Sequence, residues 1–291
     1  MSESLLEFGV PSGAAERQRL AEILAESFNV PVELELAVFE FVGNEPLRVL
    51  RRQGEVLGGL LTIPMGQYWG GRSVRLCGVG GVGIAPHARG GGVATRMMSE
   101  TLREARAQGY PLSALYPATQ PLYRNVGYEQ AGVRCELRVP LTALPSGSRE
   151  PALRPFTPED LPAVQSLYRE VARTRQGWLD RGPYIWNRVQ NPRMKKATGY
   201  VLEEAGQPSG YVFLTKVARQ DNPFFHDLHL ADLCARTEAG WRRLLSFLGG
   251  YASMARDMVW TGGTNEPLLQ LLREQSAVST HVLFHWMLRV L

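Results

Sequence analysis

A strand, a glycine-rich turn and a helix follow one another in the first half of this chain, and this succession constrains the fold most. The segment Val74–Ile84 is apolar and contains several glycines, which predicts a strand that ends just before Pro86. Arg89 and the three consecutive glycines Gly90–Gly92 follow. Apolar residues then recur at helical spacing, which predicts a helix over residues 91–108. A strand that feeds a helix through a tight turn is typical of α/β folds.

The turn between this strand and this helix has the chemistry of a phosphate site. Backbone N–H groups at a helix N-terminus lack intrahelical partners, and the helix dipole adds partial positive charge there. Gly90, Gly91 and Gly92 have no Cβ, so the backbone can approach a pyrophosphate closely. Arg89 can add a charge-assisted contact. From the glycines alone, a turn that binds no ligand remains an open alternative.

Two other phosphate motifs do not fit this stretch. A Walker A loop requires Gly-Lys-Ser/Thr at its end, whereas Gly92 is followed by Val93 and Ala94. A dinucleotide-binding fingerprint requires its glycines at the entry to the helix. The other glycines of this region instead lie inside the predicted strand, at Gly78, Gly80, Gly81 and Gly83.

Three segments of this region resemble the signature of a known superfamily. The pattern Arg89-x-x-Gly92-x-Ala94 fits the R-x-x-G-x-G/A signature of the GCN5-related N-acetyltransferases. The segment Val82–Pro86 resembles the strand that binds pantetheine in that superfamily, and Leu122–Tyr128 resembles its second signature segment. The resemblance implies an acetyltransferase fold that uses acetyl-CoA as co-substrate and needs no metal.

A narrower resemblance extends across most of the chain. The segment Tyr110–Pro117, followed by Pro121–Arg124, is similar to the Eis-like (enhanced intracellular survival) acetyltransferases. Leu153–Pro155 and Trp178–Arg181 resemble the second domain of that family. Members of that family generally carry a third, C-terminal domain, whereas this chain ends at Leu291. We therefore expect either a shorter member that lacks the third domain or a chain from which a piece is absent.

The resemblance assigns roles in cofactor binding to individual residues. It implies that Val82 and Ile84 contact pantetheine through their backbones, and a strand N–H near Val82 would polarise the thioester carbonyl. It also implies that the pyrophosphate is surrounded by Arg89, Gly90, Gly91, Gly92, Val93, Ala94 and Thr95.

Amide formation from a thioester also needs a group that protonates the leaving thiolate. A tyrosine has a pKa of about 10, above the value of about 8.5 for a thiol, so it is protonated at neutral pH and can donate to the thiolate. Tyr123 stands where the superfamily keeps this general acid, and its alternative role is that of a packed aromatic. Tyr116 and Tyr128 are the other tyrosines nearby, and we expect both to pack.

The general base and the acceptor are open from the sequence. The strand Val74–Ile84 carries no carboxylate, although many acetyltransferases place their base on a neighbouring strand. Candidates on the expected acceptor side are Glu26, Glu33, Glu35 and Glu40. The resemblance implies direct transfer to a primary amine, on either a small polyamine-like or aminoglycoside-like molecule or a protein lysine.

The whole chain predicts an α/β fold with a mixed sheet and two acetyltransferase-like domains in tandem. We assign residues 1–140 to an acetyl-CoA-binding domain and residues 153–291 to a second, degenerate domain. Residues 141–152 form a linker, because the stretch 140–151 contains three prolines with serine and glycine between them. No R-x-x-G-x-A signature precedes the helix predicted at 238–252, so the second domain is not expected to bind cofactor.

The other elements follow from apolar periodicity and turn residues. In the first domain we expect helices over 14–28 and 32–41, strands over 48–52, 55–64, 112–116 and 129–139, and a short helix leading to Tyr123. In the second we expect a helix over 158–173, strands near 199–204, 210–217, 226–234, 259–261 and 281–290, and the helix at 238–252.

Composition limits the partners of the chain. The 32 basic and 28 acidic residues form no polybasic run, which argues against nucleic acid. The absence of a long apolar stretch argues against a membrane span, and Glu3 and Glu7 argue against a signal peptide. The three cysteines form no C-x-x-C pair, which favours a cytoplasmic protein. A homo-oligomer remains open.

Two alternatives to the enzyme hypothesis remain at this point. A non-catalytic acyl-CoA-binding sensor or scaffold would fit the missing base. An enzyme similar to mycothiol synthase would require signature residues in the second domain, and the sequence does not contain them there.

Overall fold

The structure of the chain, a computed structural model, describes residues 6–147, 149–264 and 266–291. The parts of our predictions that fall on residues 1–5 and on Ser148 therefore lie outside the described residues. The chain divides into two compact units. The first unit contains Met1–Gln67, Val74–Ala131 and His285–Leu291, and the second contains Tyr68–Ser73 and Gly132–Phe284.

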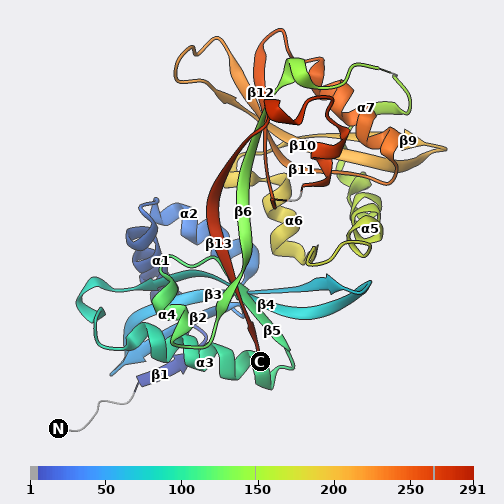
Figure 1. The fold of residues 1–291 in the computed structure, drawn as a ribbon. Coiled ribbons are helices and arrows are strands. Elements are labelled where there is room, and N and C mark those ends of the chain that lie inside the picture. The colour runs from blue at the N-terminus through green and yellow to red at the C-terminus, as the bar shows by residue number, and fades with distance from the viewer. Residues whose placement is uncertain (1–5, 148, 265) are drawn as a thin grey trace. The chain divides into compact units, whose positions relative to one another are not determined.

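The first unit is built on strands in the order β1-β2-β3-β4-β5-β13 (Figure 1). The pairs β1–β2, β2–β3 and β5–β13 are antiparallel, whereas β4 and β5 run parallel, so the sheet is mixed. The elements in chain order are β1 (Leu6–Gly9), α1 (Ala14–Phe28), α2 (Val32–Val42), β2 (Leu47–Arg52), β3 (Glu55–Trp69), β4 (Arg72–Ile84), a 3₁₀ turn (Pro86–Ala88), α3 (Val93–Ala107), β5 (Leu112–Leu115), α4 (Gln120–Arg124) and the start of β6 (Glu129–Pro140). The final strand β13 (Ser279–Val290) adds its last residues.

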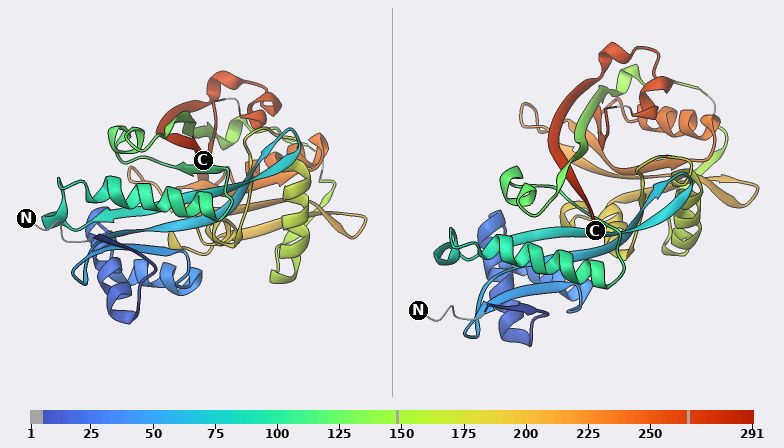
Figure 2. Two further views of the ribbon diagram at one scale, coloured as in Figure 1. Left: turned by 90° about the horizontal axis from the view of Figure 1, so that it is seen from below. Right: turned by 60° about the horizontal axis from the view of Figure 1, so that its bottom comes forward.

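Helices cover both faces of this sheet, with α3 on one face and α1 and α2 on the other (Figure 2). The helix α3 presents an apolar stripe at helical spacing, and the buried members of that stripe are Val93, Met97, Met98, Leu102 and Ala105. All of these except Ala105 join a core with residues of β2, β3, α4 and β13. On the opposite face, α1 packs closely on the sheet, because a Cβ at Gly59 would lie 2.3 Å from Leu20.

The second unit has strands in the order β13-β6-β12-β11-β10-β9-β7. Most neighbours in this sheet pair antiparallel, and β11 and β12 run parallel. Its further elements are β7 (Ala152–Pro155), α5 (Leu161–Ala172), β8 (Leu179–Asp180), α6 (Pro183–Gln190), β9 (Thr198–Glu204), β10 (Gln207–Ala218), β11 (His226–Ala235), α7 (Glu238–Gly249) and β12 (Ala255–Gly262). Short 3₁₀ turns cover 141–143, 158–160, 192–194, 267–271 and 275–277.

Two apolar clusters form the core of the second unit. One joins the helix α7 with β6, β11 and β12, and the other joins α5 and α6 with β10. The helix that we expected from residue 158 begins as a 3₁₀ turn, in which Thr157 and Asp160 form a reciprocal capping box. None of the helices in the described part of the chain is long and apolar enough to cross a membrane.

The prediction of an α/β fold with a mixed sheet is confirmed, and each element that we expected is present. Several bounds differ: β3 continues to Trp69, α3 begins at Val93, and β12 is longer than expected. Sequence analysis missed β1, α6, β7 and β8. These four elements are short, and β8 depends on pairing with β3, which a local pattern cannot reveal.

Candidate functional site

The strands β4 and β5 pair along only part of β4. Their parallel register runs from Leu76 opposite Leu112 to Val79 opposite Leu115. The strand β5 ends at Leu115, whereas β4 continues to Ile84. The segment 80–84 of β4 therefore extends beyond its last partner on β5, and an extended ligand can lie along that edge as an added strand.

Glycines shape this extension of β4. Gly81 has φ +56°, a backbone conformation that side-chain-bearing residues rarely adopt, so the strand is locally irregular there. At Gly83, a Cβ would lie 2.7 Å from Leu24 and 3.0 Å from Oγ of Ser27. The C-terminal turn of α1 therefore packs directly against the backbone of β4, and Val82 lies between these two glycines.

The turn after β4 is exposed and built on two positive φ angles. Nε of Arg89 donates to the carbonyl oxygen of Ile84 at 3.2 Å, which closes the turn back onto the strand end. Gly90 and Gly92 have φ +80° and +75°. A Cβ at either position would meet no atom of the described residues within 4 Å. These glycines are required by the backbone conformation rather than by crowding.

The helix α3 begins without a side-chain cap. Its N-cap is Gly92 in the left-handed region, and no acidic residue occupies its first turn. Val93 is buried in the core, so that residue faces the turn only through its backbone, whereas Ala94 and Thr95 are half-buried. The first amides of α3 are thus available to an anion, and the helix dipole adds partial positive charge at this end.

Tyr123 lies on the short helix α4, with its side chain in the apolar core of the first unit. It is 4% exposed, and its ring meets that of Tyr128 edge-on with 6.2 Å between centroids. Val82 and Ile84 pack against the same core. Burial raises the pKa of Tyr123, so the phenol is protonated at neutral pH. Within the described part of the chain, no hydrogen bond is made by its hydroxyl.

The two neighbouring tyrosines have different environments. The Tyr128 hydroxyl lies 2.6 Å from Oγ of Ser113, and this Oγ donates to the carbonyl oxygen of Cys77 at 2.8 Å. Burial raises the pKa of Tyr128 as well, but its hydroxyl is engaged in this structural hydrogen bond. Tyr116 is 52% exposed. Of the three, Tyr123 combines burial in the same core as Val82 and Ile84 with a hydroxyl that has no hydrogen bond among the described residues.

The four carboxylates named as candidate bases also differ from one another. Glu26, Glu33 and Glu40 are exposed, and Glu40 accepts from Arg17 at 3.0 Å. Glu35 is half-buried on α2, and burial raises its pKa. A raised pKa is the property that a carboxylate base needs near neutral pH.

The second unit repeats the strand and helix of the site but not the turn between them. Only Arg236 and Thr237 separate β11 from α7. The Thr237 side chain accepts from the backbone N–H of Gly240 at 3.1 Å, so the start of α7 is capped by its own chain. These two residues form no glycine-rich turn comparable with residues 89–92.

A largely buried ion pair lies beside β11. Asp232 on β11 pairs with Arg181 through both of its carboxylate oxygens and accepts from the Tyr211 hydroxyl at 2.5 Å. The Arg181 guanidinium lies over the Tyr168 ring, with 3.6 Å to the centroid. This ion pair joins β11 to the segment that follows β8.

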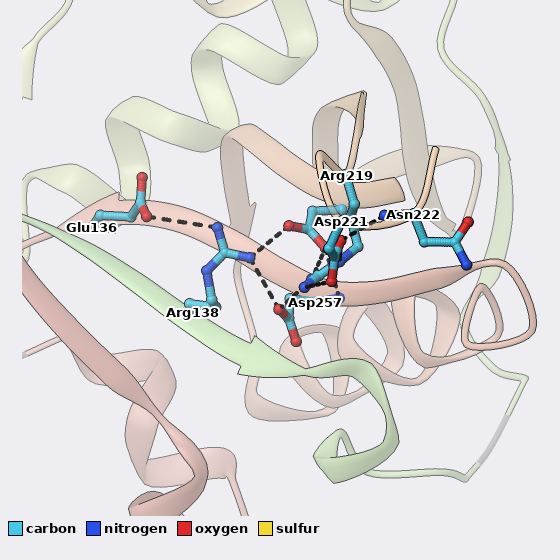
Figure 3. A network of polar contacts seen from close by, with 7 residues as sticks. Glu136, Arg138, Arg219, Asp221, Asn222 and Asp257 are labelled. Carbon is cyan, nitrogen blue, oxygen red and sulfur yellow. Dashed lines mark hydrogen bonds and ion pairs between the residues drawn. The ribbon is translucent and has the colours of Figure 1, made fainter. Parts of the chain in front are cut away.

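A polar network that sequence analysis did not predict lies in the second unit (Figure 3). Arg138 donates to Asp227 at 2.5 Å and to Asp257 at 3.0 Å, and Arg219 donates to the same two carboxylates. Burial opposes ionisation of Asp227, but the two arginines lower its pKa overall. The charges neutralise one another, so this network holds β6, β11 and β12 together.

The network borders a hollow of about 400 Å³, lined by Arg219, Asp221, Asn222, Phe225, Arg256 and Asp257. Arg219 donates to Asp221 and Asp257. The Arg256 guanidinium lies over the Phe225 ring, 3.5 Å from its centroid. No group of three or more histidine, cysteine, aspartate or glutamate side chains that could hold a metal ion occurs among the described residues.

Comparison with known proteins places the chain in a family. Residues 11–131 match a family model described as an acetyltransferase (GNAT) domain, and residues 177–290 match a second model of the same description. A crystal structure of a GCN5-related N-acetyltransferase from Anabaena variabilis aligns with a TM-score of 0.89 and 31% identity, covering 98% of this chain and 73% of that one. The chain belongs to the GCN5-related N-acetyltransferases, with two such domains in tandem.

Two further comparisons give partial or more distant similarity. Over 134 residues the chain is 32% identical to an uncharacterized N-acetyltransferase of Streptomyces coelicolor; the match covers 44% of this chain and 31% of that protein. Eis1 from Mycobacterium abscessus aligns with a TM-score of 0.76 and 19% identity, covering 98% of this chain and 73% of that one, which shows a common fold. The resemblance to Eis-like acetyltransferases is thereby confirmed at the level of the fold.

Proposed function

We propose that this protein is an N-acetyltransferase that moves the acetyl group of acetyl-CoA directly to a primary amine. The observation that carries the proposal is the free edge of β4, followed by the exposed glycine turn and the uncapped start of α3. We assign acetyl-CoA binding to residues 1–140, a linker to 141–152 and a degenerate second domain to 153–291. The capped start of α7 supports a second domain that binds no cofactor.

We assign cofactor binding to residues of this strand and of the turn that follows it. The backbones of Val82 and Ile84 lie on the extension of β4, where pantetheine would add as a strand. The turn and the first helical amides would hold the pyrophosphate, with contributions from Arg89, Gly90, Gly91, Gly92, Val93, Ala94 and Thr95.

Each chemical step has a candidate group. A backbone N–H near Val82 polarises the thioester carbonyl, and the amine nitrogen attacks the carbonyl carbon. The C–N bond forms as the C–S bond breaks, and Tyr123 donates its phenolic proton to the leaving thiolate. The amine loses one proton, for which Glu35 is the candidate acceptor on the evidence of its environment.

The acceptor class follows from the family rather than from a defined pocket. We propose a small polyamine-like or aminoglycoside-like amine, or a protein lysine. A non-catalytic acyl-CoA-binding protein is the alternative that our experiment must separate, because residues 74–84 carry no carboxylate to act as a base.

The experiment combines binding with turnover. Acetyl-CoA should raise the melting temperature by mass action, and free CoA should be released with at least one member of a panel of polyamines, aminoglycosides and lysine peptides. Tyr123→Phe should keep the thermal shift and lose turnover, whereas Tyr128→Phe serves as the matched control. Stabilisation without CoA release from any amine would favour the binding protein, and no stabilisation at millimolar acetyl-CoA would overturn the site.

A further inference from the structure

The last strand of the chain contacts the turn that follows Tyr123. The segment His285–Leu291 belongs to the first unit, where β13 pairs with β5 and places Arg289 opposite Ser113. Nη1 of Arg289 donates to the carbonyl oxygen of Val126. The sequence separation between these two residues is 163 positions, so the contact exists only in the folded chain.

The turn itself is closed by its own backbone. The carbonyl oxygen of Tyr123 accepts from the N–H of Val126 at 3.1 Å and from the N–H of Tyr128 at 3.0 Å. These hydrogen bonds connect the backbone of Tyr123 directly to the residue whose carbonyl Arg289 holds. A displacement of Val126 is therefore transmitted to Tyr123 through a single hydrogen bond.

Gly127 allows Arg289 to reach this position. Gly127 has φ +83°, and a Cβ there would lie 1.8 Å from Nη1 of Arg289. The guanidinium therefore lies against the glycine backbone. Its Nε is buried and has no hydrogen-bond partner in the described part of the chain.

A second tie fixes the other side of the turn. The Tyr128 hydroxyl is hydrogen-bonded to Ser113, the residue of β5 that Arg289 faces in the strand register. The neighbouring strands β5 and β13 thus hold the turn at two points, through Tyr128 and through Val126. Tyr123, whose hydroxyl has no hydrogen bond of its own among the described residues, depends on these ties for its position.

We propose that Arg289 is a positioning residue, which holds Tyr123 in place for proton donation by fixing the Val126–Gly127 turn. The proposal rests on the proposed function of Tyr123 as general acid. The Tyr123 ring is packed in the core, but its hydroxyl has no hydrogen bond among the described residues, so its alignment changes when the turn relaxes. Small misplacements of reacting groups strongly reduce rates.

The test compares three variants in the panel assay, using the amine that releases most CoA. Arg289→Met should lower kcat at least tenfold while the KM for acetyl-CoA changes less than twofold, since the cofactor contacts lie elsewhere. Arg289→Lys keeps a charged donor and should recover most of the rate. Arg106→Met removes an exposed arginine of α3 and should leave kcat unchanged.

A double variant separates positioning from general damage to the fold. In the Tyr123→Phe background, Arg289→Met should reduce kcat no further, because the residue acts through Tyr123. Equal losses in both backgrounds, or an unchanged kcat for Arg289→Met, would overturn the proposal. If Tyr123→Phe alone retains full kcat, the general-acid assignment fails instead.

A readout that needs no turnover completes the test. In protein with ¹³C-labelled tyrosine, the ring signal of Tyr123, assigned by its loss in Tyr123→Phe, should shift or broaden in Arg289→Met and not in Arg106→Met. A Tyr123 signal that is identical in all three proteins would show that Arg289 does not fix the ring. Should the methionine variant fail to fold, Arg289→Gln removes the guanidinium with a shorter polar side chain and provides the same comparison.

Discussion

The hydroxyl of Tyr128 lies 2.6 Å from Oγ of Ser113, and this hydrogen bond ties the segment after α4 to β5. Tyr123 stands five residues earlier in the same motif, is equally buried in the same core, and makes no such bond among the described residues. The two rings are in contact, but among the described residues only the Tyr128 hydroxyl has a hydrogen-bond partner.

This contrast predicts opposite effects for the two phenylalanine substitutions. Tyr128→Phe removes one of the two ties on the turn after Tyr123, so it should lower the free energy of unfolding by about 1 kcal/mol and reduce kcat only a few-fold, because the proton donor remains. Tyr123→Phe should keep its stability and lose about 100-fold or more in kcat. Urea unfolding and CoA release on both variants check the pair, and a kcat loss confined to Tyr128→Phe would reverse the assignment.

The positive φ angle of Gly92 predicts a specific loss of cofactor affinity. Gly92→Ala should weaken acetyl-CoA binding about tenfold or more, because a side chain disfavours the backbone that presents the first amides of α3. Gly54→Ala is the matched control, since Gly54 has φ +81° in the β2–β3 turn and equally open surroundings. Calorimetric titration should find normal affinity for that control, and equal weakening of both would contradict the site.

We expect the Thr237 cap of α7 to contribute to stability and not to cofactor binding. Thr237→Ala should lower the free energy of unfolding by about 1 kcal/mol through loss of the bond to the Gly240 N–H. The thermal shift on adding acetyl-CoA should stay the same as in the wild type, because the second domain is not expected to bind it. A diminished shift would indicate that α7 contributes to the cofactor site.

The ion pair between Glu16 and Arg51 predicts a pH-dependent contribution to stability. Nε of Arg51 donates to Glu16 Oε1 at 2.6 Å, and this contact lowers the pKa of Glu16 to about 2. The stabilisation is complete above the unfolded pKa of 4.5 and disappears as the pH falls towards 2. Glu16→Gln should therefore be less stable than the wild type at pH 7, and urea midpoints should converge as the pH approaches 2.

The partly buried carboxyl of Glu35 predicts a pH dependence of stability opposite in sign to that of Glu16. Burial raises its pKa, so the folded state holds the proton more tightly than the unfolded state, and stability decreases as the pH rises above 4.5. Glu35→Gln should consequently be more stable than the wild type at pH 8 and similar at pH 4. If Glu35 is also the base, this more stable variant will show a lower kcat; a variant with full kcat would leave the base elsewhere.

Much of the first unit could be predicted from the sequence because its signals are local. The apolar run of β4, the glycines at 90–92 and the stripe of α3 each depend on neighbours within a few positions. The short elements β1, α6, β7 and β8 were missed, because short runs carry little periodicity and their stability comes from pairing partners distant in sequence.

The sequence alone determined the strand–turn–helix and the motif around Tyr123, since glycine conformations and helical periodicity are properties of contiguous residues. Only the tertiary structure decided that the end of β13 pairs with β5, that Tyr128 is bound to Ser113, and that Arg289 holds the turn beyond Tyr123. The physical reason is that these contacts join segments distant in the chain. A hydrogen-bond partner is fixed by the packing of the whole core, which no local pattern records.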